Sequence, residues 1–519
     1  MTLTQPEPQD NPVPVRPIDD LRAFYDRLAP SDAYWKRRSA YYHRHVAQAV
    51  RRHVPAGAKV LEVGCATGQL LAALEPSEGV GVDFSPEMIR LAQEAHPGLR
   101  FVVGEALALP LDERFDYIVC HNLLGNLDDV QGFLLHLRRF LTPGGTVVVV
   151  GYNHLWQYAI GALERLRLKM PSRVTTWMPR QQLHQLLYLE DFAVKSFKSS
   201  LLIPRPWLGL GSALNWLAER LPGFHHLMLV QTTVAAMQAE TAPQPLSCTV
   251  LIPTRNERGN IENAVERTPQ LGTHTELLFV DGNSTDGTQD EIKRMIEKYQ
   301  GQKDIKLVIQ IKDEDLDDAA RAAMGRSQET GKMLPQGKGH AVRLGFSQAE
   351  GDVLMILDAD LTVPPEDLPR FFEVLAKGKA QFANGSRLVY PMESQAMRLP
   401  NLMGNKMFSV LFSWLLERYV GDTLCGTKAL RREDYQRLAA NRQVFGDFDP
   451  FGDFDLLFGA ANLNLSMVDV PVHYRARVSG DSKIINTVHT PLLFRMCWIA
   501  FRKLKLAKWF GRRPKVEQQ

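Results

Sequence analysis

The chain has 519 residues, of which 45% are hydrophobic and 23% charged, and this is enough for about two to four globular domains. Its formal net charge of +3 excludes the strong basic excess that nucleic-acid binding requires, so no nucleic-acid partner is expected. Five scattered cysteines without a C-x-x-C pair exclude a cysteine zinc site and a disulfide framework, and they favour a reducing, cytoplasmic compartment.

Two series of alternating strand and helix patterns divide the chain. Residues 1–20 are polar and proline-rich, lack the apolar run of a signal peptide, and are expected to form a disordered tail. Small, polar and proline residues near Ala242 indicate a linker between the two series. We therefore place one domain at residues 21–241, a second at 242–490 and a basic tail at 491–519. An apolar run of about 18 residues, which would indicate a membrane span, does not occur in the sequence.

The first series places glycines and carboxylates where its strands end. The apolar run 59–63 leads into a turn that contains Gly64 and Gly68. Two later apolar runs end in Asp83 and Glu105, where carboxylates are placed to accept hydrogen bonds from ribose hydroxyls and an adenine amino group. A glycine-rich turn alone indicates a bound cofactor no better than it indicates a tight structural turn.

The whole series is more specific than any one turn. The segments VLEVGCATG, GVDFSPEMI, FDYIV and LTPGG, within about Asp32 to Tyr152, resemble the class I methyltransferases that use S-adenosylmethionine. The resemblance implies a methionine site at Glu62, Gly64 and Gly68, a ribose contact at Asp83, an adenine contact at Glu105 and a lid at residues 34–42. Ala66 and Glu105 replace the usual glycine and aspartate, which leaves open a cofactor-binding relic.

The methyl-acceptor side carries fewer signals. His121 follows the fourth strand pattern and is a candidate base, although a structural hydrogen bond is the favoured interpretation of this histidine. The apolar stretches 201–204, 207–210 and 227–230 could close an acceptor pocket or contact a membrane. Packing against the sheet is the interpretation we favour for them.

The second series begins with two buried strand patterns that turn polar at their ends. Pro253, Arg255 and Glu257 follow the first, and the cluster that starts at Asp281 follows the second. Acids, hydroxyls and glycines at these positions can bind a base and ribose, although an Asx-rich turn with a helix cap would look similar. Lys338, in a later glycine-rich segment, supplies positive charge for a diphosphate.

A further apolar strand delivers Asp358 and Asp360 to its end. Two carboxylates there are electrostatically unfavourable without a cation. Mg²⁺ and Mn²⁺ prefer oxygen ligands and share them with substrate phosphates, so we expect one of these ions at this pair. The ion would neutralise a leaving nucleoside diphosphate.

From about Ser247 to Lys483 the chain resembles the inverting family-two glycosyltransferases with the GT-A fold, in particular the dolichyl- and polyprenyl-phosphate sugar transferases. The resemblance is carried by VLIPTRNE, VDGNSTDGT, GKGHAVRLGF, LDADLTVPPEDL, NGSRL, GDTLCGTKALRR and VPVHYRARVSGDSK. It implies a nucleotide site at Pro253, Arg255, Glu257 and Asp281, metal ligands at Asp358 and Asp360, sugar and acceptor contacts at Arg387 and Lys428, and phosphate contacts at Arg475 and Lys483. Gly282 replaces the usual second aspartate beside Asp281.

The acceptor decides whether a base is needed. A hydroxyl acceptor must lose a proton, and Asp455, or less favourably Asp453, stands where such a base would lie. A lipid phosphate is already nucleophilic and needs no base. The same aspartates could instead cap the helix that follows them.

Residues 492–510 read as an amphipathic helix. Arg495, Arg502, Lys505 and Lys508 gather on one side, and apolar residues that include Trp498 gather on the other. Such a helix suits a lipid headgroup region, and packing on the domain core is the alternative. A membrane surface on the cytoplasmic face is therefore an expected contact.

Together these patterns predict an α/β protein with two doubly wound domains, a class I methyltransferase Rossmann-like sheet followed by a GT-A nucleotide-sugar-binding sheet, and a C-terminal amphipathic helix. The expected function is a bifunctional transferase that moves a sugar from a nucleotide-sugar donor to a polyprenyl phosphate or glycan and methylates a second acceptor with S-adenosylmethionine. The alternatives are a glycosyltransferase with an inert, cofactor-sensing front domain and a non-enzymatic membrane scaffold.

Overall fold

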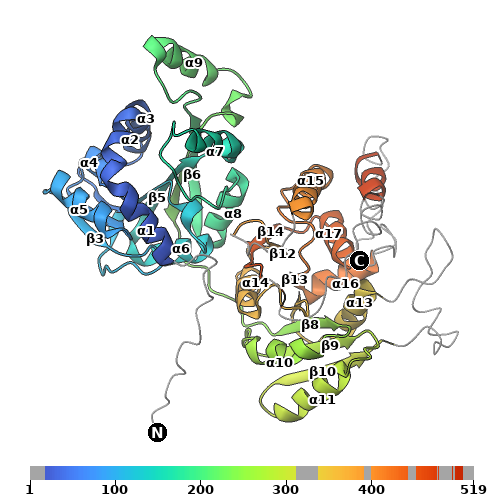
Figure 1. Ribbon diagram of the computed structural model, residues 1–519. Helices are drawn as coiled ribbons and strands as arrows, with labels where there is room; N and C mark the ends of the chain where they lie inside the picture. Colours follow the sequence, from blue (N-terminus) through green and yellow to red (C-terminus); the bar gives the residue numbers. More distant parts are fainter. Residues whose placement is uncertain are drawn as a thin grey trace, which may run out of the picture. The chain divides into compact units, whose positions relative to one another are not determined.

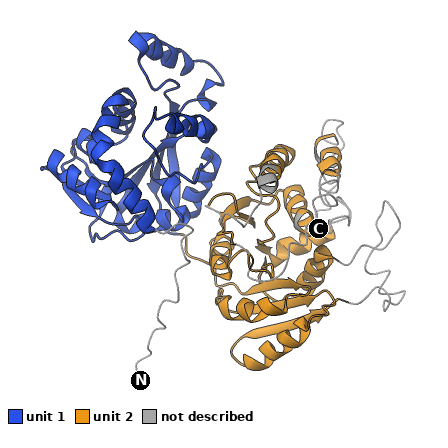
Figure 2. Cartoon of the chain, viewed as in Figure 1, with its two compact units in different colours: residues 1–240 blue, residues 241–519 orange. Residues whose placement is uncertain are grey.

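The computed structural model describes residues 18–310, 337–390, 399–441, 452–475, 477, 494 and 497–506. The chain forms two compact units, unit 1 at residues 1–240 and unit 2 at residues 241–519 (Figure 2). Each unit is built on one mixed seven-stranded sheet with helices packed against it, so the predicted α/β class is confirmed (Figure 1).

The sheet of unit 1 has the strand order β3-β2-β1-β4-β5-β7-β6. Its strands are β1 (Lys59–Val63), β2 (Glu78–Asp83), β3 (Arg100–Val103), β4 (Phe115–His121), β5 (Leu141–Tyr152), β6 (Phe192–Ser200) and β7 (Val230–Met237). The first five run parallel, and β7 pairs antiparallel with both β5 and β6. Residues 141–145 belong to β5, which is irregular where it pairs with Phe115 and Tyr117 of β4.

The helices of unit 1 are α1 (Ile18–Leu28), α2 (Asp32–Arg38), α3 (Ala40–Arg51), α4 (Gln69–Ala73), α5 (Pro86–Ala95), α6 (Val130–Leu137), α7 (Gln157–Arg165), α8 (Arg180–Leu189) and α9 (Leu210–Ala218). Helix α1 begins at Ile18, inside the segment 1–20 that was predicted to be a disordered tail. Helix α5 begins where its sequence dictates, because the Ser85 hydroxyl accepts a hydrogen bond from Met88 N and Pro86 needs no such partner.

The sheet of unit 2 has the strand order β10-β9-β8-β11-β13-β12-β14. Its strands are β8 (Cys248–Thr254), β9 (Thr275–Asp281), β10 (Asp304–Ile309), β11 (Val353–Ile356), β12 (Phe382–Ser386), β13 (Lys428–Arg431) and β14 (Met467–Pro471). Strand β13 is antiparallel to its neighbours β11 and β12, whereas the other pairs are parallel.

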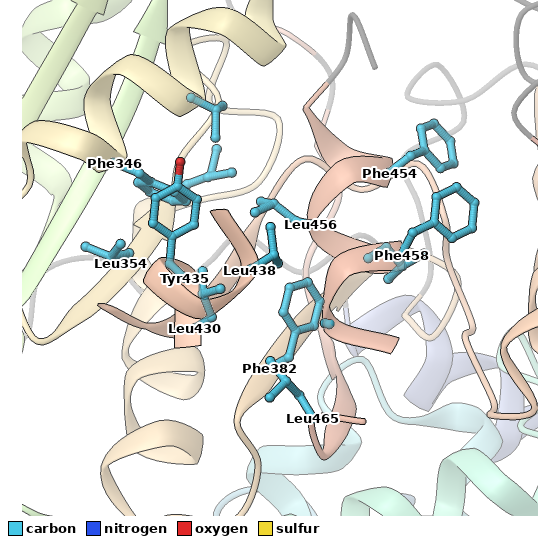
Figure 3. Close-up of a cluster of buried hydrophobic side chains, with 14 of the residues drawn as sticks. Phe346, Leu354, Phe382, Leu430, Tyr435, Leu438, Phe454, Leu456, Phe458 and Leu465 are labelled. Atoms are coloured by element: carbon cyan, nitrogen blue, oxygen red, sulfur yellow. The ribbon is translucent and has the colours of Figure 1, made fainter. Parts of the chain in front are cut away.

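The helices of unit 2 are α10 (Arg258–Arg267), α11 (Thr288–Lys298), α13 (Lys338–Gln348), α14 (Leu368–Ala376), α15 (Leu399–Leu416), α16 (Arg432–Ala440) and α17 (Asp453–Asn462), and a π-helix spans Phe501–Leu506. Apolar side chains from α13, α16 and α17 meet those of β11, β12 and β13 in one buried cluster (Figure 3). Phe346, Phe382 and Phe454 are among its members. This cluster holds the starts of α13 and α17 against the sheet.

Strand register brings the polar residues of unit 2 to one edge. Thr254 pairs with Asp281 at the ends of β8 and β9, and Leu357 N donates to Leu251 O just beyond β11. Because these three strands are parallel, the segments that follow them all begin at the carboxyl-terminal end of the sheet.

Alanine at Gly351 tests how closely β11 approaches β8. A Cβ there would lie 2.4 Å from Thr249 N and 2.6 Å from Cys248 C, both backbone atoms. We expect Gly351→Ala to lower the free energy of unfolding of unit 2 by about 1–3 kcal/mol. Differential scanning calorimetry can follow the thermal transition of this unit.

Gly404→Ala is the matched control, because a Cβ on Gly404 in α15 meets nothing within 4 Å. Alanine there removes a residue that disfavours helix, so we expect it to stabilise unit 2 by up to about 1 kcal/mol. Equal shifts in the same direction for both variants would contradict the close approach at Gly351.

Candidate active sites

The glycine-rich turn after β1 is held in an unusual backbone conformation. Gly64, Ala66 and Gly68 have φ angles of +75°, +48° and +70°. A Cβ on Gly68 would lie 2.5 Å from the Phe101 ring, so only glycine fits there. Ala66 adopts the same left-handed region with a side chain, which costs about 1–2 kcal/mol. Its amide donates to Asp83 Oδ2 at 2.9 Å, and this bond helps to hold the strained residue.

Two buried carboxyls flank this turn. Glu62 is 2% exposed and accepts a hydrogen bond from Leu71 N at 2.9 Å. Burial raises the pKa of Glu62 to about 8. Asp83 accepts from the amides of Ala66 and Ser85, and burial raises its pKa as well. A carboxylate has about four acceptor positions, so these two bonds leave Asp83 able to accept from ribose hydroxyls.

Glu105 has a partner that the sequence did not indicate. Its Oε1 atom lies 3.1 Å from Arg22 NH2, and the Arg22 Nε atom donates to Phe84 O at 3.1 Å. Helix α1 therefore ties down the carboxylate that was expected to bind an adenine amino group.

The predicted lid at residues 34–42 contains a lysine that contacts the turn. Lys36 Nζ lies 2.6 Å from Thr67 Oγ1 and 2.9 Å from Asp32 Oδ2, and Thr67 also donates to Asp32 at 2.7 Å. Sequence reasoning missed both Lys36 and Asp32. The contact of Lys36 with Thr67 could not be predicted from the sequence, because α2 and the turn lie far apart in the chain and meet only in the folded protein.

His121 ends β4 within a buried polar cluster. Its Nε2 atom lies 3.0 Å from both the Tyr42 hydroxyl and Asn122 Nδ2. Burial lowers the pKa of His121 to about 3 and that of His43 to about 4, so both rings are neutral at pH 7. The geometry matches the hydrogen-bonded interpretation of His121. Asn122 Oδ1 is buried and accepts no hydrogen bond from the described part of the chain, so the cluster retains an acceptor.

In unit 2, the loops after β8 and β9 are joined by hydrogen bonds. Asn256 N donates to Ser284 Oγ, and Thr285 N donates to Asn256 Oδ1, each at 2.9 Å. Asp281 is fully buried and accepts from Ser284 N at 2.9 Å and Gln289 Nε2 at 2.6 Å. Asp281 therefore shapes the loop on which a nucleotide would rest.

The other residues expected at a nucleotide lie along the same two loops. Pro253 is half-buried within β8, and Arg255 is exposed just beyond it. Glu257 accepts from Asn260 Nδ2 at 2.8 Å, and its amide donates to Thr288 Oγ1 at 2.9 Å. The structure thus places all three beside the loop that Asp281 organises.

Each aspartate after β11 faces a cation. Lys338 Nζ, at the start of α13, lies 2.7 Å from Asp358 Oδ1, and Arg477 NH2 lies 2.9 Å from Asp360 Oδ2. Burial would raise the pKa of Asp358, but the Lys338 charge holds it below its usual value. Burial and the neighbouring Asp358 raise the pKa of Asp360. Two carboxylates that repel each other and attract two cations form a suitable place for a divalent ion and a diphosphate.

Arg477 is a site residue that sequence reasoning missed. The prediction named Arg475 and Lys483 as phosphate contacts. Arg475 N donates to Thr362 O at 2.9 Å, which lays its segment along the Asp360 loop. Lys483 lies outside the described residues. Residues two apart in an extended segment point to the same side, so the basic pattern at 475 and 477 could have indicated either arginine.

Arg387, whose side chain is 11% exposed, and Lys428 both lie near this centre. Arg387 makes two contacts with Asp422, at 2.6 Å and 2.9 Å. Although burial would raise the pKa of Asp422, this arginine lowers it to about 2. Lys428 is fully buried and donates to Cys425 O, and its charge lowers the pKa of Asp358 further. Both cations therefore act on the site from within the protein.

The candidate base lies on a helix that begins close to Asp358. Asp455 is 8% exposed in the first turn of α17, and the side chain of Asp453 lies outside the described residues. Gly452 has a φ of +74°, and a Cβ on it would lie 2.9 Å from Gly339 Cα. Since Lys338 directly precedes Gly339, the starts of α13 and α17 meet close to Asp358.

The predicted two-sided helix at 492–510 is wrong at Lys505. Lys505, placed on the basic face, is only 8% exposed, and its Nζ lies 2.7 Å from Glu417 Oε1. The reason is that this segment packs on α15, where the rings of Trp414 and Phe501 stack at 5.8 Å. Trp498, predicted to lie on the apolar face of the helix, is 58% exposed. Arg495 and Lys508 lie outside the described residues.

Exposed apolar side chains gather where this segment meets α15. Met407, Val410 and Trp414 are 49%, 72% and 49% exposed at helical spacing. Among the described residues, no helix is both long and apolar enough to cross a membrane.

Comparison with known families assigns each unit to a class. Residues 34–196 match the family model of a methyltransferase domain, and residues 249–329 and 334–438 match that of glycosyl transferase family 2. Both resemblances found in the sequence are thereby confirmed.

Several curated proteins resemble one half of the chain or the other. The dolichol-phosphate mannosyltransferase of Pyrococcus furiosus is 26% identical over 250 residues, 46% of this chain and 59% of that protein. The undecaprenyl-phosphate 4-deoxy-4-formamido-L-arabinose transferase of Pseudomonas fluorescens is 29% identical over 248 residues, 46% of this chain and 61% of that protein. The demethylmenaquinone methyltransferase of Chlorobaculum tepidum is 27% identical over 146 residues, 25% of this chain and 58% of that protein. The chain thus spans about three fifths of the length of these relatives.

Alanine at Gly426 tests the geometry around Asp358. A Cβ there would lie 2.1 Å from Asp358 Oδ2 and 2.6 Å from Lys338 Nζ. We expect Gly426→Ala to displace this pair and weaken Mn²⁺ binding at least about tenfold, because two-carboxylate ligation depends on ligand position. Electron paramagnetic resonance titration of free Mn²⁺ measures the affinity.

Gly404→Ala, in open space in the same unit, should leave Mn²⁺ affinity unchanged. Full Mn²⁺ affinity in folded Gly426→Ala protein would show that Asp358 is not a ligand.

Proposed function

We propose that this chain, which joins a methyltransferase domain to a glycosyl transferase family 2 domain, is a bifunctional transferase. Unit 2 would move a sugar from a nucleotide-sugar donor to a polyprenyl phosphate or glycan, and unit 1 would methylate a second acceptor with S-adenosylmethionine. The observation that carries the glycosyl transfer is the pairing of Asp358 with Lys338 and of Asp360 with Arg477 at the end of β11.

The donor half of the site fits a nucleoside diphosphate sugar. Asp358 and Asp360 would hold Mg²⁺ or Mn²⁺, which prefers oxygen ligands and leaves positions for phosphate oxygens. Such an ion would neutralise charge on the leaving diphosphate. When the aspartates bind the ion, Lys338 and Arg477 can turn to the phosphates, so the same four side chains serve the site with and without donor. The loops after β8 and β9 would hold the base and ribose.

A polyprenyl phosphate is the acceptor we favour. Two of the relatives are named for transfer to dolichol phosphate or undecaprenyl phosphate. A phosphate acceptor is already anionic, so Asp455 would then position groups at the start of α17 rather than remove a proton. The exposed apolar surface of α15 and Trp498 supports contact with a membrane, where such a lipid resides. The proposal includes that the protein acts at the cytoplasmic face of this membrane.

The cofactor half of unit 1 fits S-adenosylmethionine. The left-handed turn at Gly64 to Gly68 leaves room for a ligand to approach the backbone, and Asp83 retains acceptor positions for ribose hydroxyls. The cofactor would supply a methyl group on a positively charged sulfur. Glu62 would lie near the methionine part and favour that positive charge when ionised. Asn122 Oδ1 offers an acceptor for a substrate hydroxyl or amine.

One observation supports the alternative of a cofactor-sensing unit 1 without turnover. Arg22 already engages one carboxylate oxygen of Glu105, so an adenine amino group would have to share this side chain with α1. Binding of S-adenosylmethionine without methyl transfer to any fraction of a membrane lipid extract would favour the sensor.

Asparagine at either metal aspartate tests the glycosyl transfer. We expect Asp358→Asn and Asp360→Asn to lower transfer from the productive donor roughly 100-fold or more, because each removes a metal-binding charge. The assay incubates the full chain with a panel of nucleotide sugars and undecaprenyl phosphate and detects lipid-linked sugar by mass spectrometry.

Asp304→Asn is the matched control, because this carboxylate lies at the other end of the parallel strands, at the start of β10. Its activity should equal that of the unchanged chain. Undiminished transfer by Asp358→Asn or Asp360→Asn would overturn the proposed metal pair.

Glu62 predicts how cofactor affinity depends on pH. Below about pH 8 the Glu62 carboxyl is protonated in the protein without cofactor, since burial raises its pKa to about 8. A bound cation favours the ionised form, so binding releases a proton, and affinity should rise with pH until it levels off near that pKa. If binding releases one full proton, the affinity rises by at most about tenfold for each pH unit. Calorimetric titrations at pH 6, 7 and 8 measure this slope.

Glu62→Gln should flatten the slope, because glutamine does not titrate. S-adenosylhomocysteine, whose sulfur is uncharged, should show a weaker dependence than S-adenosylmethionine with the unchanged chain. A slope that is identical in Glu62→Gln would place the coupled proton elsewhere.

A further inference from the structure

Unit 1 carries an exposed apolar segment between β6 and β7, residues 201–229, which includes α9. Figure 1 shows α9 standing at the edge of the unit, clear of the sheet. Nine large apolar side chains of this segment are exposed: Trp207, Leu208, Leu210, Leu214, Trp216, Leu217, Leu221, Phe224 and Leu227. The prediction that these stretches pack against the sheet therefore holds only for their ends, at Leu201 and at Met228 to Val230, which are buried.

Helix α9 presents the reverse of the usual amphipathic pattern. Its buried positions are Gly211, Asn215 and Ala218, which are small or polar. Its leucines at 210, 214 and 217 repeat at helical spacing and are 60%, 37% and 46% exposed, and Leu221, just beyond the helix, is 41% exposed. A helix that only completed the fold would bury the leucine stripe.

Specific polar contacts hold α9 in this orientation. Asn215 Oδ1 accepts from the amides of Leu202 and Ile203 at 2.9 Å and 2.8 Å, and Asn215 Nδ2 donates to Ile203 O at 2.9 Å. The Ser212 and Tyr41 hydroxyls lie 3.2 Å apart and join α9 to α3. The outward position of the leucines is thus fixed by the buried face of the helix.

The turn before α9 is strained in a way that exposes a leucine. Trp207, Leu208 and Gly209 all have positive φ angles, of 39°, 54° and 97°. Leu208 is 108% exposed, so its side chain packs against no neighbour. Packing of this leucine therefore does not offset its unfavourable backbone conformation. Strain of this kind is typical of functional segments.

The charges around the segment are mainly positive. Residues 201–229 hold two arginines and one glutamate, and the adjoining residues 154–170 hold two arginines, one lysine and one glutamate. The two stretches touch where Trp156 Nε1 donates to Leu227 O at 2.8 Å. The Arg220 guanidinium lies 4.0 Å from the ring of Trp216, so a cation and an indole share one position on the surface.

We propose that residues 201–229 dock unit 1 on an anionic lipid surface. Leucines with tryptophans and arginines beside them match the acyl boundary and the headgroups of a bilayer. Reversible protein interfaces are only about as apolar as the remaining surface, which fits this segment poorly. The surface belongs to unit 1 alone, so the proposal does not depend on which acceptor unit 2 uses.

The test places an environment-sensitive fluorophore on a cysteine introduced at Leu208 in the full chain. All five native cysteines are buried, so the introduced thiol reacts selectively. Vesicles are phosphatidylcholine alone or phosphatidylcholine with one third phosphatidylglycerol. We expect a blue shift and a rise in emission with the anionic vesicles, and loss of the signal at high salt. The same probe at Leu135 of α6, which is 49% exposed, should stay silent.

A second variant measures the contribution to binding. Leu208→Glu with Leu214→Glu should weaken vesicle partitioning of the full chain at least about tenfold, because two leucines no longer enter the lipid. Leu135→Glu should leave partitioning unchanged.

Three results would overturn the proposal. A silent probe at Leu208 on protein that floats with vesicles would assign binding to another surface. If the emission is blue-shifted without vesicles and does not depend on protein concentration, another part of the same chain covers residues 201–229. Emission that rises with protein concentration alone would identify a second copy of the chain as the occupant.

Discussion

Two carboxylates at the end of one buried strand impose the constraint around which unit 2 is arranged. Asp358 and Asp360 are two residues apart and repel each other, and burial together with this repulsion raises the pKa of Asp360. The fold answers with cations from distant segments, Lys338 from the start of α13 and Arg477 from beyond β14. Gly426 supplies the space in which Lys338 and Asp358 meet. The placement of α13, the strand order and Gly426 thus all help to bring cations to these two carboxylates.

Unit 1 meets a related requirement with fewer charges. Glu62 and Asp83 are buried beside the turn after β1, and burial raises the pKa of both. Backbone amides satisfy them in part, and Lys36 is the nearby cation, since its charge lowers the pKa of each. Ala66 shows that the turn is determined by these contacts rather than by glycine alone, because it adopts a left-handed conformation with a side chain.

The parts of the fold that follow from local sequence were predictable. Apolar runs followed by glycine or polar residues located β1, β2, β8, β9 and β11 and the residues at their ends, because each strand and the turn after it are neighbours in the chain. The resemblance to two families added the order of the elements.

The partners of those residues were not predictable from one sequence. Arg22 with Glu105, Arg387 with Asp422 and Arg477 with Asp360 join positions 35 to 117 residues apart, and sequence spacing holds no information on such pairs. Lys505 was misplaced for the same reason, because Glu417, with which it pairs, lies far away in the sequence, just beyond α15. The inverted faces of α9 show a further limit, since periodicity locates an apolar stripe without telling which side of the helix faces the protein.

The hydrogen bonds that link the loops after β8 and β9 have a thermodynamic consequence. Asn256 with Ser284 and Thr285, and Asp281 with Ser284 and Gln289, hold both loops without help from a ligand. The conformational entropy of these loops is lost when the chain folds and not again at each encounter with a nucleotide. Association of a nucleotide would then resemble the docking of a rigid ligand on a rigid surface, for which a small change in heat capacity and a rapid association rate are characteristic.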